Sequence, residues 1–518
     1  MTQFDNYIVY VSKKVCNSFS KKIIKLSNYQ IVTFLTAYCL LFTAYSNAQS
    51  IIKSYPDKVA SRFSDYEIIG KNDAGIVVHF FGNNESELVT YDSKLRIDNR
   101  RELPFTGKNI TLENILLQKD KILIFYSTQQ DNYLYFKLKV LDNKLNIPNE
   151  SILLDSIPTI SIDKGKPFYV KTSDDKSKIL LFSMLRTKSS YYVRFTVLND
   201  SIQIITKNLF SVQEANNVSL KSIKVNNSGN VMAVIGKESG FGNSDYDFAS
   251  YTSFTYNKNT NTIAEQVLQQ PNYIFKNLIT ETSKNREIGY LAACYKNTQN
   301  KNDLGIFYQI IDFRTNTVLL NSKMPFTDDI LRNSQTNEFK TWQDKATLVK
   351  PKRIIPRSDG GMVLITEGEY KYTKAERLQV SNYGYYNSMP MSSSVRYIDQ
   401  NFYYDIGLFS INIDGTVDWQ ASLPKAQVSE NDDGYFSSFA FFEANNVLKF
   451  LFNEDFYNIG NFVEYNINPN GITKRQSVMN SEKQNLVMVP LKAKQLDGHT
   501  IIFPSEQKRN LQFVLFEY

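Results

Sequence analysis

The sequence predicts an all-β protein, and specifically a β-propeller of seven or eight four-stranded blades. Three observations support this prediction. Short strand-like segments recur along almost the whole chain, and a turn-plus-strand unit repeats eight times. In addition, 14% of the residues are aromatic and only 21% are charged, which is the composition of a folded globular protein rather than a disordered one.

The strand-like segments are apolar or alternating runs, rich in Val, Ile, Tyr, Phe and Thr, and closed by Asn, Asp, Lys or Gly. β-Branched and aromatic residues favour strands, whereas the closing residues favour turns. Each unit consists of a polar turn, an apolar strand suited to full burial, and a half-polar strand that ends in Asp or Asn. The eight turns lie at residues 73–75, 119–121, 174–177, 227–229, 283–285, 359–361, 445–446 and 497–498.

Successive turns are about 46 to 86 residues apart, and most spacings are near 50, as in four-stranded propeller blades. A single blade would expose an apolar face, so a closed ring is needed to bury all of them. The last unit ends on its third strand at Tyr518, and residues 51–53 are expected to supply the fourth strand. Tandem β-sandwiches are the alternative, but they predict a Pro/Gly/Ser-rich linker near the middle, which the sequence lacks.

The N-terminal segment has the pattern of a secretory signal peptide. Lysines precede an apolar run, Ile31–Tyr45, that is too short to span a bilayer comfortably. Ser46 and Ala48 then supply small residues before a cleavage point at Gln49. We predict a signal peptide over residues 1–48 and a single exported propeller domain over residues 49–518, with no transmembrane span after cleavage. An uncleaved N-terminal anchor is the alternative.

Charge and composition exclude several classes of function. The formal net charge is +7, but five lysines and one aspartate place +4 of it in residues 1–48. The rest is spread along the chain without a basic stripe, so no nucleic-acid partner is expected. Two histidines, His79 and His499, and one cysteine after cleavage, Cys294, are too few for a His-rich metal site or a Ser-His triad. No catalytic residue, cofactor or metal site is predicted.

Glu367 and Glu369 form the most suggestive acidic pair, because residues two apart in a strand share a face. A glycosidase needs two carboxylates roughly 5–10 Å apart across a cleft, and one strand rarely provides that geometry. Solvated strand residues are therefore the preferred interpretation. A carbohydrate-active enzyme that uses Asp and Glu ranks last among the functions considered. His79 lies inside an apolar strand, where a packed histidine is expected.

A long polar and aromatic insertion interrupts the period at residues 370–403. A loop of this length within a compact domain is usually functional or disordered, and rigid aromatic side chains suit protein recognition. An extended β-hairpin packed on its own blade is an equally weighted alternative. The predicted partner-binding residues are the clustered Tyr383, Tyr385, Tyr386, Met389 and Met391.

Residues 359–455 carry a resemblance to known proteins. The strand Asp405–Gly415 (DIGLFSINIDG) is followed by Trp419, Lys425 and Gln427-Val428-Ser429. This order resembles exported, propeller-like proteins of the Bacteroidota, in which a DIIVIKINPDG-type strand precedes a Trp and a Lys-containing Gln-Val-Ser segment. The resemblance implies export and a β-rich propeller-like fold, and it carries no settled activity.

The resemblance also implies a location. Bacteroidota use the type 9 secretion system, whose cargo typically ends in a β-sandwich sorting domain, whereas this chain ends in a predicted core strand, Gln512–Tyr518. We therefore expect it in the periplasm or at the periplasmic face of the outer membrane, with secretion as the alternative. A plug-like soluble subunit of that system's translocon has a comparable size. The expected function is a non-catalytic protein-interaction propeller associated with an outer-membrane complex, and a glycan- or ligand-binding propeller is the alternative.

Overall fold

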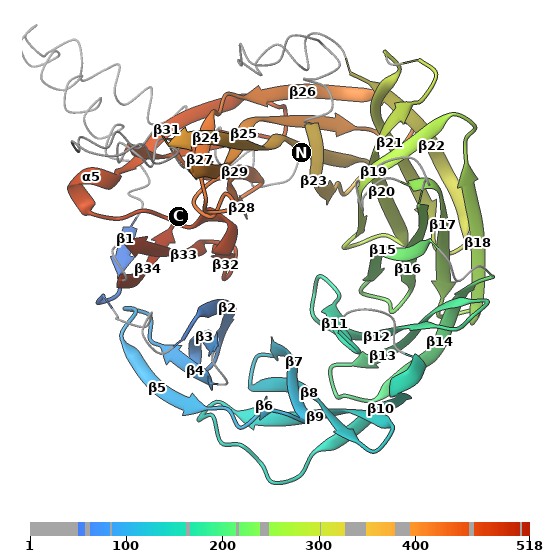
Figure 1. Ribbon diagram of the computed structural model, residues 1–518, viewed down its shortest axis with the longest axis horizontal. Coiled ribbons are helices and arrows are strands. Elements are labelled where there is room, and N and C mark those ends of the chain that lie inside the picture. The colour runs from blue at the N-terminus through green and yellow to red at the C-terminus, as the bar shows by residue number, and fades with distance from the viewer. Residues whose placement is uncertain are drawn as a thin grey trace, which may run out of the picture. The chain divides into compact units, whose positions relative to one another are not determined.

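The computed structural model describes residues 50–56, 63–82, 85–161, 166–213, 217–238, 248–300, 302–326, 349–378, 394–454, 460–507 and 510–518. Contacts divide the chain into two units, Ile52–Leu515 and a small one formed by Met1–Ile51 and Phe516–Tyr518. The larger unit is a ring of antiparallel sheets, whose strands follow one another from the centre of the ring outward (Figure 1). The predicted β-propeller is therefore confirmed, and the tandem β-sandwich alternative is excluded.

The first four blades follow one another along the chain. Their strands are, in blade 1, β2 (Asp65–Asn72), β3 (Gly75–Gly82), β4 (Glu85–Tyr91) and β5 (Ile97–Glu102); in blade 2, β7 (Ile110–Leu117), β8 (Lys121–Gln130), β9 (Tyr133–Asp142) and β10 (Ile152–Pro158), with the short β6 (Thr106–Gly107); in blade 3, β11 (Tyr169–Thr172), β12 (Lys178–Arg186), β13 (Tyr191–Asn199) and β14 (Ile204–Val212); in blade 4, β15 (Val218–Val225), β16 (Val231–Glu238), β17 (Phe248–Asn257) and β18 (Thr262–Gln269).

The next three blades continue this order, and a single residue pair, Phe248 with Phe275, joins blade 5 to blade 4 as one sheet. Their strands are, in blade 5, β19 (Tyr273–Thr282), β20 (Ile288–Asn297), β21 (Leu304–Asp312) and β22 (Thr317–Pro325); in blade 6, β23 (Val349–Pro356), β24 (Met362–Leu378), β25 (Ser394–Ile411), β26 (Val417–Leu423) and β27 (Gln427–Glu430); in blade 7, β28 (Ala440–Ala444), β29 (Val447–Asn453), β30 (Asn461–Ile467) and β31 (Thr473–Asn480).

Blade 8 closes the ring with strands from both ends of the chain, in the order β1-β34-β33-β32. The backbone N–H of Ser54 donates to the carbonyl of Phe513 at 2.9 Å, and the Ser54 hydroxyl accepts the Phe513 N–H at 2.9 Å. The closing strand expected at residues 51–53 is thereby confirmed, and the described residues form eight blades. The strands are β32 (Lys494–Gln495), β33 (Thr500–Gln507), β34 (Asn510–Glu517) and β1 (Ser50–Lys53).

Helical structure in the described residues is confined to one short α-helix and two 3-10 turns. These are α5 (Ser481–Gln484), η2 (Thr159–Ser161) and η3 (Pro490–Lys492). Within the same residues, no helix is long and apolar enough to cross a membrane.

The hydrophobic core lies between the blades rather than in the centre of the ring. One apolar cluster joins each neighbouring pair from blades 1 and 2 round to blades 6 and 7, and another joins blade 8 to blade 1. Between blades 7 and 8, the rings of Phe462 and Phe503 meet edge to face at 5.2 Å. The second strand of a blade is buried on both faces, as residues 231–235 of β16 show with 0–2% exposure. The apolar runs of the sequence form these central strands because they can be buried on both faces.

The repeated Asp and Asn residues have a common structural role in the turns. After the third strand of blade 1, Oδ1 of Asp92 accepts the backbone N–H groups of Lys94 and Arg96, both at 2.9 Å. These hydrogen bonds hold the pKa of Asp92 below its usual value. In the first turn of blade 4, Asn226 caps the chain in the same way, and Gly229 adopts φ +93°, which favours glycine.

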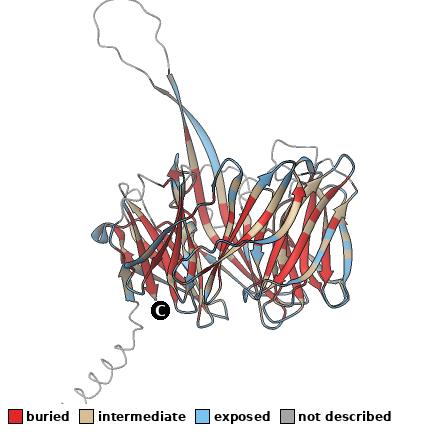
Figure 2. Ribbon diagram, turned by 90° about the horizontal axis from the view of Figure 1, so that it is seen from below, coloured by how far each residue is buried: buried red, intermediate tan, exposed pale blue. Residues whose placement is uncertain are grey.

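The ring has two different faces. The eight predicted turns join the first and second strands of the blades and gather around the central opening at one face, which we call the turn face. At the opposite face, the turns join second to third strands. The hairpin β24–β25 is much longer than the others and projects from this side (Figure 2). We call this side the arm face.

Candidate functional site

The predicted partner-binding residues Tyr383, Tyr385, Tyr386, Met389 and Met391 lie outside the described residues. The two segments that flank them are described, and they pair in register from Glu369 with Tyr403 to Leu378 with Ser394. The described part of the insertion therefore consists of two paired antiparallel strands, as the hairpin alternative expects, but they project from the ring rather than packing on their own blade (Figure 2). We call residues 369–378 and 394–403 the arm.

The arm leaves the ring at a β-bulge. β23 pairs with β24 only as far as Gly368, so beyond that point β24 has β25 as its partner. β25 carries one extra residue at Tyr404 and Asp405, opposite Gly368. Such bulges bend a strand and redirect it. A side chain at Gly368 would place its Cβ 2.9 Å from the Cβ of Tyr404, so the close approach of the two strands requires glycine here.

Aromatic rings run along one face of the arm from the rim of the ring outward. The rings of Tyr372 and Tyr370 are 6.4 Å apart, those of Tyr370 and Phe402 are 6.0 Å apart, and those of Phe402 and Tyr404 are 6.2 Å apart. Phe402 is buried, whereas Tyr372 is 47% exposed. On the other face of the hairpin, Tyr397 is 68% exposed. The arm therefore presents large aromatic side chains to solvent.

A buried ion pair lies at the base of the arm. The Lys425 Nζ is 2.8 Å from Oε1 of Glu367, and both side chains have no exposed surface. The Ser438 hydroxyl donates to the other Glu367 oxygen at 2.8 Å, and Lys425 donates to Oε1 of Gln427 at 3.0 Å. Burial lowers the pKa of Lys425, and the Glu367 carboxylate opposes this shift. Lys425 and Glu367 thus compensate each other's charge away from water.

The acidic pair singled out in the sequence is part of this network. Lys352, on the innermost strand of blade 6, lies 2.7 Å from Glu369 and 3.3 Å from Glu367. The two carboxylates share a face, as their spacing predicts, but the expectation that both are solvated is wrong, because Glu367 is fully buried. Lys352 lies on another strand, and Lys425 and Ser438 lie further along the chain. The local sequence pattern around Glu367 therefore does not reveal these partners. Lysines occupy both carboxylates, so they are not a free acid–base pair.

The network also connects blade 6 to blade 7. Gln427 donates to the carbonyl of Asn453 at 2.6 Å and accepts the backbone N–H of Ser438 at 2.8 Å. Lys425 and Gln427 are among the residues that carry the resemblance described above. The Lys-containing Gln-Val-Ser segment was therefore the sign of this site in the sequence. The strand periodicity gave no reason for those residues.

Asp405, in the bulge, is a second buried carboxylate at the arm base. Oδ1 accepts the backbone N–H of Lys425 at 2.9 Å, whereas Oδ2 is buried without a hydrogen-bond partner among the described residues. Burial raises the pKa of Asp405 to about 6, and the hydrogen bond from Lys425 and its charge oppose that shift. Asp405 is therefore an ionisable group whose charge changes near neutral pH.

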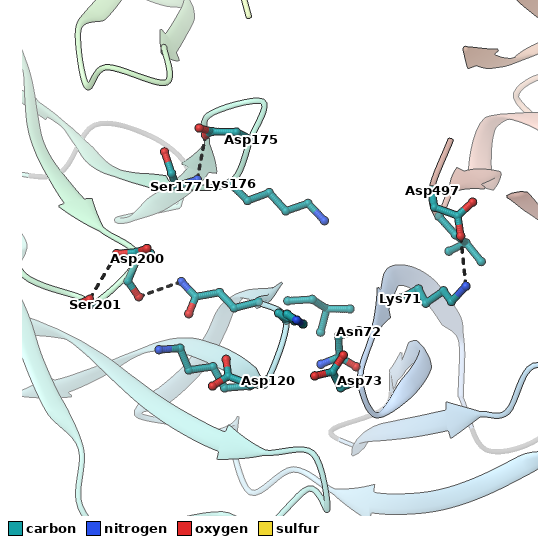
Figure 3. Close-up of a pocket in the computed structure, with 15 residues that line it drawn as sticks. Lys71, Asn72, Asp73, Asp120, Asp175, Lys176, Ser177, Asp200, Ser201 and Asp497 are labelled. Carbon is teal, nitrogen blue, oxygen red and sulfur yellow. Dashed lines mark hydrogen bonds and ion pairs between the residues drawn. The ribbon is translucent and has the colours of Figure 1, made fainter. Parts of the chain in front are cut away.

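The turn face contains a hollow of about 680 Å³ among the first turns of blades 1, 2, 3 and 8 (Figure 3). Its charged side chains include both signs, five aspartates and four lysines. Lys71 pairs with Asp497 at 3.1 Å, and Gln118 donates to the carbonyl of Asp200 at 3.2 Å. The opposite charges offset one another, so this hollow does not select a ligand by charge.

His79 and Cys294, two other residues with reactive side chains, are packed within the blades. His79 is buried in β3, as expected, and burial lowers its pKa to about 4. Cys294 contacts the carbonyl of Val349 at 3.1 Å, and burial raises the pKa of its thiol to about 12, so it stays protonated at neutral pH. In the described part of the chain, no group of three or more His, Cys, Asp or Glu residues is arranged to hold a metal ion.

No protein-family model matches the chain, and no curated protein matches it. Solved structures with similar folds include a prolyl endopeptidase, at 9% identity and a TM-score of 0.33, covering 78% of this chain and 54% of that one. The chain thus spans about half the length of that enzyme. Synechocystis apocarotenoid oxygenase matches at 9% identity and a TM-score of 0.31, covering 68% of this chain and 72% of that one. A protein from Lactobacillus plantarum matches at 10% identity and a TM-score of 0.34, covering 80% and 95%. These similarities are distant, and the fold assignment rests on the sheet order itself.

Proposed function

We propose that this protein is an exported, non-catalytic interaction propeller that binds a protein partner through its arm face. The observation that carries the proposal is the arm itself, a long hairpin with exposed Tyr372 and Tyr397, anchored by the buried Lys425–Glu367 ion pair. Exposed aromatic residues on a rigid support are typical of protein-binding surfaces, because they supply contact area at low entropic cost.

The proposed location is the periplasm or the periplasmic face of the outer membrane, with secretion as the alternative. The signal-peptide pattern of residues 1–48 and the resemblance to exported Bacteroidota proteins support it. The proposed partner is an outer-membrane complex such as the type 9 translocon. A plug-like subunit would act by occluding an opening and would leave it when cargo arrives. Such a role requires a reversible, largely polar interface rather than an obligate apolar one.

The arm can be shortened without cutting into the ring. Thr373 and Asp399 face each other across the hairpin, and the Thr373 hydroxyl donates to the Asp399 carboxylate at 2.6 Å. Replacing residues 374–398 by Asn-Gly would close this pair with a two-residue turn. The tagged full chain and the shortened chain are then purified from native envelopes, and the bound proteins are identified by mass spectrometry.

We expect the full chain to retain a large outer-membrane β-barrel protein and the shortened chain to lose it, with unchanged melting temperature. The double variant Tyr372→Ala/Tyr397→Ala should weaken capture by about tenfold, because exposed aromatics are common hot spots. Ile97→Ala, which changes a 45% exposed apolar residue on the outer strand of blade 1, is the matched control. Equal recovery by the full and shortened chains would contradict the proposal.

A ligand-binding propeller is the second candidate, with a glycan as the expected class. A cleft of about 490 Å³ between blades 1 and 2 favours a small ligand of some class, since it is large enough to hold one. Affinity without turnover on a glycan array would support this candidate, whereas hydrolysis of a glycan would indicate the carbohydrate-active enzyme that ranks last.

A further inference from the structure

A cleft separate from the arm opens between the inner strands of blades 1 and 2. Its volume is about 490 Å³, and it is lined by the start of β7, the end of β3 and the short strand β6. Glu67, on β2, is exposed at this cleft, whereas Glu113, on β7, is only 7% exposed. A cleft of this size is in the range of small-molecule sites in proteins.

Glu113 is the most unusual residue of the cleft. The Ser127 hydroxyl donates to its Oε1 at 2.6 Å, whereas its Oε2 is buried and has no hydrogen-bond partner among the described residues. Buried carboxylate oxygens are normally paired, because an unpaired one loses its hydration without compensation. The free oxygen therefore points to a partner outside the described residues, and a bound ligand in the cleft would supply one.

The charges that line the cleft are mostly negative. Glu67, Glu85 and Glu113 line it together with one lysine, Lys166. Burial raises the pKa of Glu113, and the hydrogen bond from Ser127 and the charge of Lys166 oppose this shift. His79 also lines the cleft, but it is neutral at pH 7, because burial lowers its pKa to about 4. An anionic ligand would be repelled by this set, and a cation would be attracted.

Apolar side chains also line the cleft. Phe81 lines the cleft and stacks on the His79 ring at 5.0 Å, with an angle of 27° between the planes. Ile110 and Leu112 of β7 line it as well. An inorganic cation would gain nothing from these walls, whereas an organic cation would bury its apolar part there and would also be attracted to the face of an aromatic ring.

We propose that this cleft binds an organic cation, namely an ammonium group on a short apolar body. The ammonium group pairs with Oε2 of Glu113, and the body packs against Phe81 and Ile110. A free amine and the lysine side chain of a bound peptide share this chemistry. The proposal does not depend on the arm or on any outer-membrane partner.

Isothermal titration of the purified full chain tests the proposal with three probes: n-butylammonium, its neutral analogue n-butanol, and N-acetyl-lysine methylamide. We expect at least one cationic probe to bind and n-butanol to bind at least about tenfold more weakly, since hydrogen bonds to charged groups are among the stronger ones. Preference for n-butylammonium indicates a free amine, and preference for the lysine derivative indicates a peptide.

Three variants make the test specific. Glu113→Gln keeps the shape of the side chain and should weaken the cationic probes by about tenfold or more. Glu265→Gln, on the exposed outer strand of blade 4, is the matched control and should change nothing. If Glu113→Gln lowers the melting temperature, Lys166→Ala provides the second test. Removing the exposed cation should tighten binding of the cationic probes about two- to threefold.

Three results would overturn the proposal. These are equal affinity for n-butanol and n-butylammonium, unchanged affinity in a folded Glu113→Gln variant, and absence of binding by both cationic probes at tens of millimolar. Unchanged or weaker binding in Lys166→Ala would also count against it, because repulsion by that lysine is part of the argument.

Discussion

Blades 5 and 6 are neighbours built to the same plan, yet only blade 6 extends into an arm. In blade 5 the central hairpin ends where Lys296 pairs with Leu304, and every residue of β21 is buried. In blade 6 the corresponding hairpin continues to Leu378 and Ser394. The two hairpins share one apolar cluster, so their difference does not lie in the cores that they have in common.

The difference lies at the arm face, where blade 6 contains buried charges. At the same face, blade 5 has buried apolar residues such as Phe307, which is 1% exposed. Blade 6 instead buries Glu367 and Lys425 completely and leaves the ring through a bulge at Tyr404 and Asp405. A projecting hairpin loses the inter-blade contacts that hold the others, and the ionic network at its base replaces them. Three changes test this comparison.

Lys425→Met should have the largest effect on stability. It leaves the Glu367 carboxylate buried without its closest cation, and we expect a loss of about 3–5 kcal/mol in the free energy of unfolding. Urea unfolding followed by circular dichroism measures it. The double variant Glu367→Gln/Lys425→Met should recover most of the loss, because no uncompensated charge remains. A single variant as stable as the wild type would show that the ion pair does not anchor the arm.

Gly368→Ala should have an intermediate effect, about 1–3 kcal/mol, because its Cβ would lie 2.9 Å from that of Tyr404 and the strands would have to separate. Thermal unfolding provides the measurement. Gly498→Ala in blade 8 is the matched control, since nothing lies within 4 Å of the position that its methyl group would take. Equal melting temperatures of the two variants would show that the bulge does not force β24 and β25 into close contact at Gly368.

Asp405→Asn should have the smallest effect, and its sign should depend on pH. The folded-state pKa is about 6, above the ordinary 3.8, so the folded protein binds this proton more tightly than the unfolded chain does. The wild type should therefore lose stability as the pH rises from 4 to 6, and the variant should lack this component. At pH 8 we expect the variant to be more stable by about 1–2 kcal/mol, after allowance for partial solvation, and at pH 4 the two should be equal.

Stability curves of the two proteins at pH 4, 6 and 8 provide the measurement. A constant difference between them across this range would show that folding does not raise the pKa of Asp405.

Most of the fold could be predicted from the sequence repeat, because the residues of each turn-plus-strand unit favour that turn and that strand locally. The Asp and Asn residues that close the third strands cap the following turns with their side chains, which accept nearby backbone N–H groups, as Asp92 does. Such contacts span only a few residues, and so they can be recognised in sequence. The closing strand at residues 51–53 could be predicted because a ring with an incomplete last blade needs a partner for it.

The candidate site could be predicted only in part. The position of the insertion was recognisable because it breaks the period, but its described residues are strands, in which Tyr370 and Phe402 face each other. The role of Glu367 was misjudged, because its partners Lys425 and Ser438 are 58 and 71 residues away in the chain. Local pattern carries no information about partners at that distance.

The amino-acid sequence was enough to predict the all-β class, the repeated blade, the number of turn-plus-strand units and the place where the repeat is interrupted. These follow from residue propensities and from contacts within a few residues. The three-dimensional arrangement of the blades was needed to show which carboxylates are buried, which are paired, and that Glu113, whose Oε2 has no partner among the described residues, lines a cleft. Those properties depend on which blades meet around the ring, because burial and pairing are set by neighbours in space rather than in the chain.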